Sequence, residues 1–254
     1  MILIAAMLGV AACGSRQADK AASPEPAEYA EQREPGDSTI YGLACDGCTD
    51  TILVLLPPSG EDPDTFNILG AMEQHQVFGR PEIGDKMAVV LSGEDSTVAS
   101  IVIDLERLKG GWCYMVKPQL RQRAGLDMRR MQELYQQRDS IWQQLMKLRE
   151  YGMEIRGDYT AHSIGVTYSM TADDKSPVVY PPQKHYREWR IFNGRLILKE
   201  TRRDTAGVVT VVNTDTAEFV TMRRDTLALR FSDGTVQGYY RKLEEKKLEE
   251  GSAR

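Results

Sequence analysis

The sequence lacks the short motifs on which many enzyme families build a reactive centre. It contains no P-loop, no glycine fingerprint of a dinucleotide-binding fold, no HExxH helix and no GxSxG elbow. Histidine is scarce, and His75, His162 and His185 share no metal-ligand spacing. We therefore expect a protein without enzymatic activity and without a cofactor.

Positive charge and long apolar stretches are also missing. The net charge of −5 provides no general attraction to phosphate backbones, which argues against nucleic acid as a partner. No stretch after the N-terminus approaches the roughly 18 apolar residues of a membrane-spanning helix. With 254 residues and 41% hydrophobic composition, the chain suits one large or two small globular domains.

The N-terminus has features of an export signal. Residues 1–13 form an apolar run, too short to cross a bilayer, that ends in small residues and a cysteine. Val10-Ala11-Ala12-Cys13 resembles the lipobox of bacterial lipoproteins, which implies that Cys13 becomes the mature N-terminus and carries a diacylglyceryl thioether and usually an N-acyl chain such as palmitate. Several acyl chains anchor a protein durably to a membrane. An ordinary secretory signal cleaved elsewhere is the alternative. No Lys or Arg precedes the run, which is consistent with a start codon upstream of Met1.

Residues 14–38 are predicted to be a disordered tether. Three prolines and almost no bulky apolar side chains leave this segment too little surface to bury.

Residues 39–118 are predicted to form a small OB-like β-barrel. The expected strands are 39–44, 51–56, 87–91, 98–105 and 112–116, with Asp46-Gly47 as a hairpin turn. Asp64 is expected to cap a short helix that runs to Met72. Five short strands and one helix are typical of such a barrel.

A long helix is expected over residues 126–151, within a connecting segment of residues 119–152. Apolar side chains recur there at three- and four-residue spacing: Met131, Leu134, Ile141, Leu145 and Leu148. A dimerising coiled coil is one interpretation. We favour a helix that covers a barrel or bridges two domains, and hence a monomer.

Residues 153–242 read as an antiparallel meander that closes into a barrel. Residues 158–170 are predicted to form one or two strands, and further strands are predicted at 187–192, 195–201, 208–212, 217–222, 226–231 and 235–240. Asn193-Gly194 is the clearest turn, because this pair favours the type I′ hairpin. Residues 243–254 form a charged tail. The predicted fold class is therefore mainly β with one long helix (α+β).

Several segments resemble a known family. WRIFNGRLIL, TAEFVTMRRDTLALRF and GYYRK look like the lipocalin-like domain of exported Bacteroides-type lipoproteins, and YGLACDGCTDTILVLLP resembles an N-terminal region of such proteins. The resemblance implies an envelope setting and no particular reaction. In these lipoproteins surface export goes with acidic residues after the lipidated cysteine. Gly14-Ser15-Arg16-Gln17 has none, which favours the periplasmic side.

Cys45, Cys48 and Cys113 are the sharpest candidates for chemistry. We favour a structural disulfide, because cysteines that flank a two-residue turn lie within bonding range, although either one could instead pair with Cys113. A zinc site completed by a histidine and a redox site are the alternatives. The strands on either side argue against redox catalysis, since a thioredoxin-like CxxC precedes a helix.

Aromatic residues of the second domain are candidates for the lining of a ligand pocket. They are Tyr159, Tyr168, Trp189, Phe192, Phe219, Phe231 and Tyr239. Because small barrels also fill their interiors with such side chains, we expect most of them to be core residues.

The predicted function is that of a non-enzymatic lipoprotein, anchored through Cys13, that binds an apolar small molecule or an envelope protein. A structural or assembly component without a ligand is the alternative. A thiol-redox or metal enzyme at Cys45 and Cys48 is a second alternative.

Overall fold

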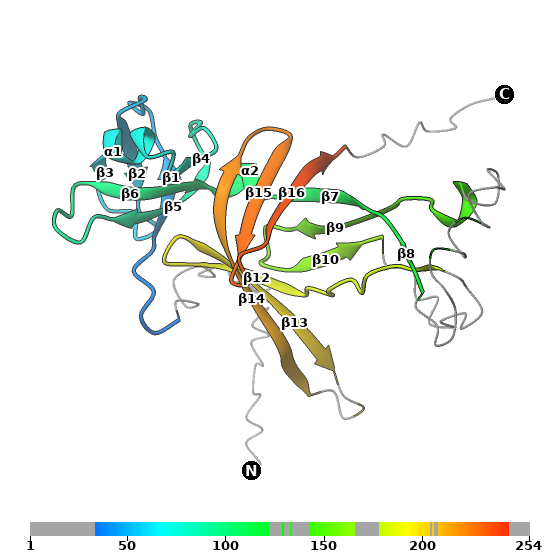
Figure 1. Ribbon diagram of the computed structural model, residues 1–254. Helices are drawn as coiled ribbons and strands as arrows, with labels where there is room; N and C mark the ends of the chain where they lie inside the picture. Colours follow the sequence, from blue (N-terminus) through cyan, green and yellow to red (C-terminus); the bar gives the residue numbers. More distant parts are fainter. Residues whose placement is uncertain are drawn as a thin grey trace, which may run out of the picture. The chain divides into compact units, whose positions relative to one another are not determined.

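The computed structural model describes residues 34–121, 129, 133, 143–165, 178–203, 205 and 208–243. This part of the chain consists mainly of strands that form two larger sheets and one two-stranded sheet (Figure 1). Its helices are short: α1 (Leu69–Glu73) has five residues and α2 (Leu105–Leu108) has four, and residues 143–145 are also helical. None of the described helices is long and apolar enough to cross a membrane.

The first sheet has six strands in the order β3-β2-β1-β5-β6-β4. Their bounds are β1 Ile40–Ala44, β2 Ile52–Leu56, β3 Asp64–Asn67, β4 Val77–Phe78, β5 Lys86–Leu91 and β6 Ala99–Asp104. Neighbours are antiparallel except β4 and β6, and a parallel bridge joins Asn67 to Val98.

The second sheet is an eight-stranded antiparallel barrel. Its strands are β7 Gly110–Val116, β9 Arg149–Ile155, β10 Ala161–Ile164, β12 Glu188–Phe192, β13 Arg195–Arg203, β14 Val209–Met222, β15 Thr226–Phe231 and β16 Val236–Lys242. Successive strands are neighbours, and the last strand, β16, pairs with the first, β7. A bridge between Thr160 and Glu188 nearly closes the remaining gap. This is the up-and-down topology of lipocalins, so the expected antiparallel barrel is confirmed. The short strands β8 (Gln119–Leu120) and β11 (Val178–Val179) pair separately.

The predicted fold class is wrong in its long helix. No helix among the described residues reaches seven residues, and the end of the predicted segment is strand β9, which begins at Arg149. Tyr151, Met153 and Ile155 recur there at the period of two that a strand requires, and all three are buried. Residues 122–128, 130–132 and 134–142 of this segment lie outside the described residues.

Two further assignments in the first predicted domain are wrong. Strand β7 was expected to complete the small barrel, but it pairs with β9 and β16 of the second sheet. The segment after Asp64 was expected to be helical, but it begins with β3, and α1 starts only at Leu69. Phe66 explains the strand, because its ring is buried in the core of the first sheet.

The two predicted hairpin turns have different outcomes. Asn193 and Gly194 both have positive φ (47° and 76°), so the type I′ turn is confirmed. Of Asp46 and Gly47, only Gly47 has positive φ. The β1–β2 connection is longer than two residues, because β1 ends at Ala44 and β2 begins at Ile52. The backbone amide of Cys45 donates to the Val54 carbonyl at 2.9 Å. The predicted strands at 208–212 and 217–222 are one continuous strand, β14.

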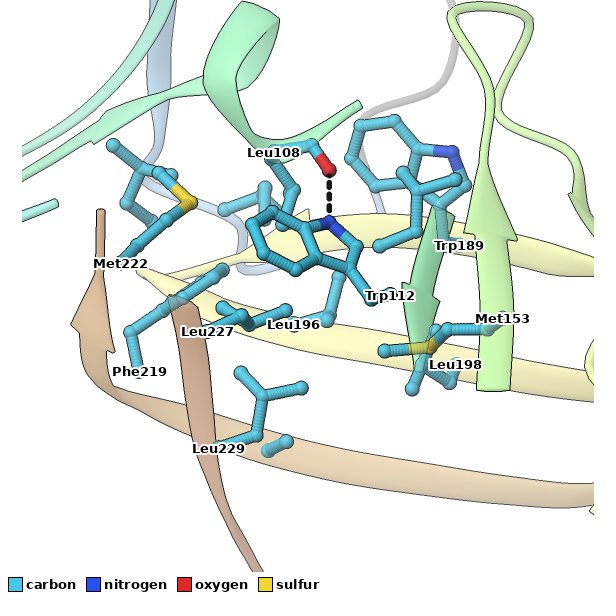
Figure 2. Packing of buried hydrophobic residues seen from close by; sticks show 14 of the residues in the cluster. Leu108, Trp112, Met153, Trp189, Leu196, Leu198, Phe219, Met222, Leu227 and Leu229 are labelled. Carbon is cyan, nitrogen blue, oxygen red and sulfur yellow. Dashed lines mark hydrogen bonds between the residues drawn. The ribbon is translucent and has the colours of Figure 1, made fainter. Parts of the chain in front are cut away.

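One hydrophobic cluster joins the barrel to the first sheet. Phe78 of β4 packs on Phe219 of β14 with ring centroids 5.2 Å apart. Figure 2 shows the centre of this cluster, where the Trp112 indole donates to the Leu108 carbonyl at 2.7 Å. The Tyr41 hydroxyl also donates to the Ile191 carbonyl, at 3.1 Å. The two sheets therefore share a core.

The last residues of the predicted tether contact the barrel. Glu34 forms ion pairs with Lys199 at 2.5 Å and Arg190 at 3.5 Å. Asp37 accepts from the Asn193 amide at 3.0 Å, and Ser38 donates to the Asn193 side chain. Residues 14–33 of the tether and 244–254 of the tail lie outside the described residues.

Candidate functional site

The end of the barrel that meets the first sheet is filled by side chains. Trp112, Trp189, Leu196, Leu198 and Leu227 are buried together there, as Figure 2 shows. Protein interiors are packed as densely as organic crystals, so this region leaves no room for a ligand. Among the described residues, this end of the barrel therefore forms no deep cavity for a large apolar ligand.

A cavity of about 190 Å³ lies elsewhere in the barrel. Its walls come from β7, β9 and β16, from the end of β15, from the segment before β12, and from the turn between β15 and β16. The lining residues are Tyr114, Gly152, Met153, Pro182, Gln183, Lys184, Tyr186, Phe231, Asp233, Thr235, Gln237 and Tyr239. The lining mixes aromatic and hydrogen-bonding groups, which is typical of small-molecule sites.

Strand alternation explains how the walls are formed. Along β7, Trp112 and Tyr114 share one face of the strand because they are two residues apart. Trp112 lies in the filled core and Tyr114 lines the cavity, so the same face serves both regions. On β16, Tyr239 lines the cavity, whereas its neighbour Tyr240 pairs with Cys113 and is exposed.

Gly152 allows β9 to approach β7 closely. A Cβ atom at this position would clash with the Trp112 carbonyl oxygen and lie 2.9 Å from the Cys113 sulfur. Gln183 then holds the segment before β12 against β9 and β10, because its amide nitrogen donates to the carbonyls of Gly152 (3.1 Å) and Ile164 (2.7 Å). These contacts fix the walls on either side of Tyr114.

Tyr186 is held by a carboxylate on β14. Its hydroxyl donates to Asp215 at 2.6 Å. Burial, followed by this hydrogen bond, raises the pKa of Tyr186, so its hydroxyl stays protonated at neutral pH. Lys184 approaches both Asp215 oxygens at 2.8 Å and balances the carboxylate charge.

Tyr114 and Tyr239 differ from Tyr186 because their hydroxyls have no hydrogen-bond partner among the described residues. The two rings meet at 90° with centroids 5.3 Å apart. No hydrogen bond joins either hydroxyl to another group in the part of the chain that the structure describes. Tyr239 is only 8% exposed. Two polar groups are thus presented to the cavity, and both can donate to a ligand.

The predicted pocket residues are divided between cavity and core. Phe231 and Tyr239 line the cavity. Trp189 and Phe219 are core residues, and Tyr159 packs on Trp189 at 5.2 Å between ring centroids. Phe192 is half-buried at the end of β12. Tyr168 lies outside the described residues.

Tyr114, Lys184 and Asp215 belong to the site but were not predicted from the sequence. Tyr114 was overlooked because β7 was assigned to the other domain. The spacing of Trp112 and Tyr114 could have indicated it, because aromatic residues two positions apart lie on the same face of a strand and such a face usually points into a core.

The three candidate cysteines of the described chain are free thiols. Cys45 and Cys48 lie in the β1–β2 connection and are half-buried, whereas Cys113 is buried in β7 of the other sheet. The Cys48 sulfur exchanges hydrogen bonds with the Val54 backbone at 3.3 and 3.5 Å. The described residues contain no group of three or more metal-binding side chains. Cys13 lies outside the described residues.

Comparisons with known proteins give one weak structural likeness and no activity. The sequence matches no protein-family model and no curated protein. Among solved structures, a weak neighbour is a lipocalin-like protein from Bacteroides thetaiotaomicron with 15% sequence identity and a TM-score of 0.27. The match covers 53% of this chain and 95% of that chain. The chain is therefore similar, in about half of its length, to a lipocalin-like protein.

Proposed function

We propose that this protein is a non-enzymatic, lipid-anchored protein of the bacterial envelope that binds one small molecule in the cavity beside Tyr114 and Tyr239. The observation that carries the binding proposal is the pair of tyrosines that line the cavity and whose hydroxyls have no hydrogen-bond partner among the described residues. A hydroxyl that lines a cavity and has no protein partner can donate to a ligand without first giving up another hydrogen bond within the protein.

The anchor is proposed from the sequence Val10-Ala11-Ala12-Cys13. Lipidation at Cys13 would hold the barrel at a membrane surface, facing the periplasm. Metabolic labelling with palmitate in the native host tests this part. We expect labelled protein in the membrane fraction and loss of the label in Cys13→Ala. Unlabelled wild-type protein in the cytosol would contradict the anchor and leave the binding proposal untouched.

Native mass spectrometry of protein purified from its own host tests the binding proposal. We expect a bound small molecule in one-to-one ratio. Gln237→Trp should release it, because the larger side chain projects from the lining into the cavity. Val236→Trp is the matched control, since Val236 is the preceding residue of β16 and is 52% exposed. Wild-type protein that is empty, or a ligand retained in Gln237→Trp, would contradict the proposal.

A second candidate function is that of an assembly component. Strand β12 pairs with β13 only as far as Lys199, and β15 pairs with β14 only from Ala217. Residues 200–203 and 209–214 therefore form a two-stranded ribbon, called here the β13–β14 ribbon, without a described strand on either edge (Figure 1). Residues 208–214, VVTVVNT, carry no charge, and Val209, Val211 and Val212 are about half exposed.

An edge of this kind favours the addition of another strand. Soluble proteins usually protect free edges with charges or proline, and this segment has neither. We propose an uncharged extended strand of an envelope protein as its occupant. A photo-crosslinking residue at Thr210 should capture one reproducible partner in cells, and Val211→Lys should abolish the capture. A crosslink that persists in Val211→Lys, or none at all, would contradict this candidate.

A further inference from the structure

The size of the cavity favours a ligand with a single ring. A volume of about 190 Å³ exceeds that of an engineered cavity of about 150 Å³ that binds benzene. It is well below the roughly 300–1,000 Å³ of sites for drug-sized molecules. A fused-ring compound or a long acyl chain is larger than this space and would extend beyond it.

The tyrosine hydroxyls allow the site to donate hydrogen bonds to a ligand. Burial raises the pKa of Tyr239, and the neighbouring Tyr114 raises it further. Burial likewise raises the pKa of Tyr114. Both hydroxyls therefore keep their protons at neutral pH. Because Tyr186 already donates to Asp215, the hydroxyls of Tyr114 and Tyr239 are the ones left to donate to a ligand.

The charge of the site disfavours an anion. Lys184 is the cationic residue of the described lining, and both oxygens of Asp215 already lie 2.8 Å from its Nζ atom. Asp233, at the rim, accepts from the Thr235 amide at 2.8 Å and adds negative charge. A ligand carboxylate or phosphate would meet no unpaired positive group among these residues.

We infer that the ligand is an uncharged compound of a single ring with a carbonyl oxygen that accepts hydrogen bonds from Tyr114 and Tyr239. A carbonyl oxygen has two lone pairs, so it can accept from both hydroxyls at once. Phe231 and Met153 supply the apolar contacts for the ring. This inference rests on the proposed small-molecule function and names the chemical class.

Three small probes test the inference by calorimetry or by NMR titration of the purified protein. Acetophenone has the ring and the carbonyl, ethylbenzene replaces the carbonyl by a methylene, and benzoate adds a negative charge. We expect acetophenone to bind at least about tenfold more tightly than either of the others, because two neutral hydrogen bonds contribute this much or more. The advantage over ethylbenzene should shrink in Tyr114→Phe or Tyr239→Phe and disappear in the double variant. Tyr240→Phe, on the outer face of β16, should leave it unchanged.

The outcomes separate this inference from the proposed function. Equal binding of acetophenone and ethylbenzene, or an advantage that survives in the Tyr114→Phe/Tyr239→Phe variant, would overturn the carbonyl class while leaving a small-molecule site. Tightest binding of benzoate would also overturn it. Failure of all three probes to bind a folded protein would contradict both the inference and the proposed function.

Discussion

The rings of Tyr114 and Tyr239 meet edge to face, 5.3 Å apart, on two paired strands that are far apart in the sequence. Strand β7 enters the barrel from the first sheet, and β16 completes the barrel at the end of the chain. The pairing of these two strands thus both closes the barrel and assembles the wall of the cavity.

Tyr186→Phe should destabilise the protein more than Tyr114→Phe. The Tyr186 hydroxyl bonds to the Asp215 carboxylate at 2.6 Å, and hydrogen bonds to charged groups contribute about 1.5–3 kcal/mol. Tyr114 has no such partner, so its variant should unfold within about 0.5 kcal/mol of wild type. Urea denaturation of the three proteins checks the difference. Equal losses in both variants would show that the two hydroxyls have similar surroundings.

Gly152→Ala should destabilise the barrel by about 3 kcal/mol or more. The added methyl group would clash with the Trp112 backbone, which is held by strand pairing and cannot move away cheaply. Gly238→Ala is the matched control, because Gly238 also lies in a barrel strand but has no atom within 4 Å of the added carbon. Thermal unfolding of both variants is the measurement. A Gly152→Ala protein as stable as the control would mean that β7 and β9 do not pair as described.

Asp104 should make stability decrease as the pH rises from about 4 to 6. Burial raises the pKa of this carboxyl from 3.8 to about 6, and its Oδ2 atom has no hydrogen-bond partner. The folded protein therefore binds the proton more tightly than the unfolded chain, and ionisation costs up to about 3 kcal/mol of stability. Asp104→Asn keeps an oxygen that can accept from the Arg107 amide and cap α2.

The difference between wild type and Asp104→Asn isolates this group from all other titrating residues. We expect wild type to lose stability relative to the variant between pH 4 and 6 and to stay level above pH 7. A difference that does not depend on pH would show that Asp104 titrates normally.

The thiols should differ in reactivity. Cys45 and Cys48 are half-buried and free, so both should react with a thiol reagent in the native Cys13→Ala protein. Cys113 is fully buried, and burial raises its pKa to about 11, so it should react only on unfolding. Two fast thiols are the expected count. A count of zero would indicate a Cys45–Cys48 disulfide in the purified protein.

Local signals in the sequence predicted local structure well. Asn193-Gly194 determines its own backbone conformation, because both positions need positive φ, and its hairpin forms as expected. The alternating residues of β12 and β13 were likewise assigned to strands, since their pattern is independent of the strand's neighbours.

The pairing of strands that are far apart in the sequence could not be predicted in the same way. Nothing near β7 indicates that its partners are β9 and β16 rather than β6, because the pairing depends on residues up to the end of the chain. The start of β9 was assigned to a helix, since Leu145 and Leu148 continue a helical spacing into a segment that alternates from Tyr151 onward. The cavity depends on β7, so Tyr114 was missed together with that pairing.

The most direct test of the account is the position of a bound ring compound relative to Tyr114 and Tyr239. Uniformly isotope-labelled protein, in complex with unlabelled acetophenone, can be examined by NMR for nuclear Overhauser contacts between the ligand and the side chains. We predict contacts from the ligand to the rings of Tyr114, Tyr239 and Phe231, and none to Trp189 in the filled core. Contacts confined to residues outside the cavity, such as the β13–β14 ribbon, would contradict the account.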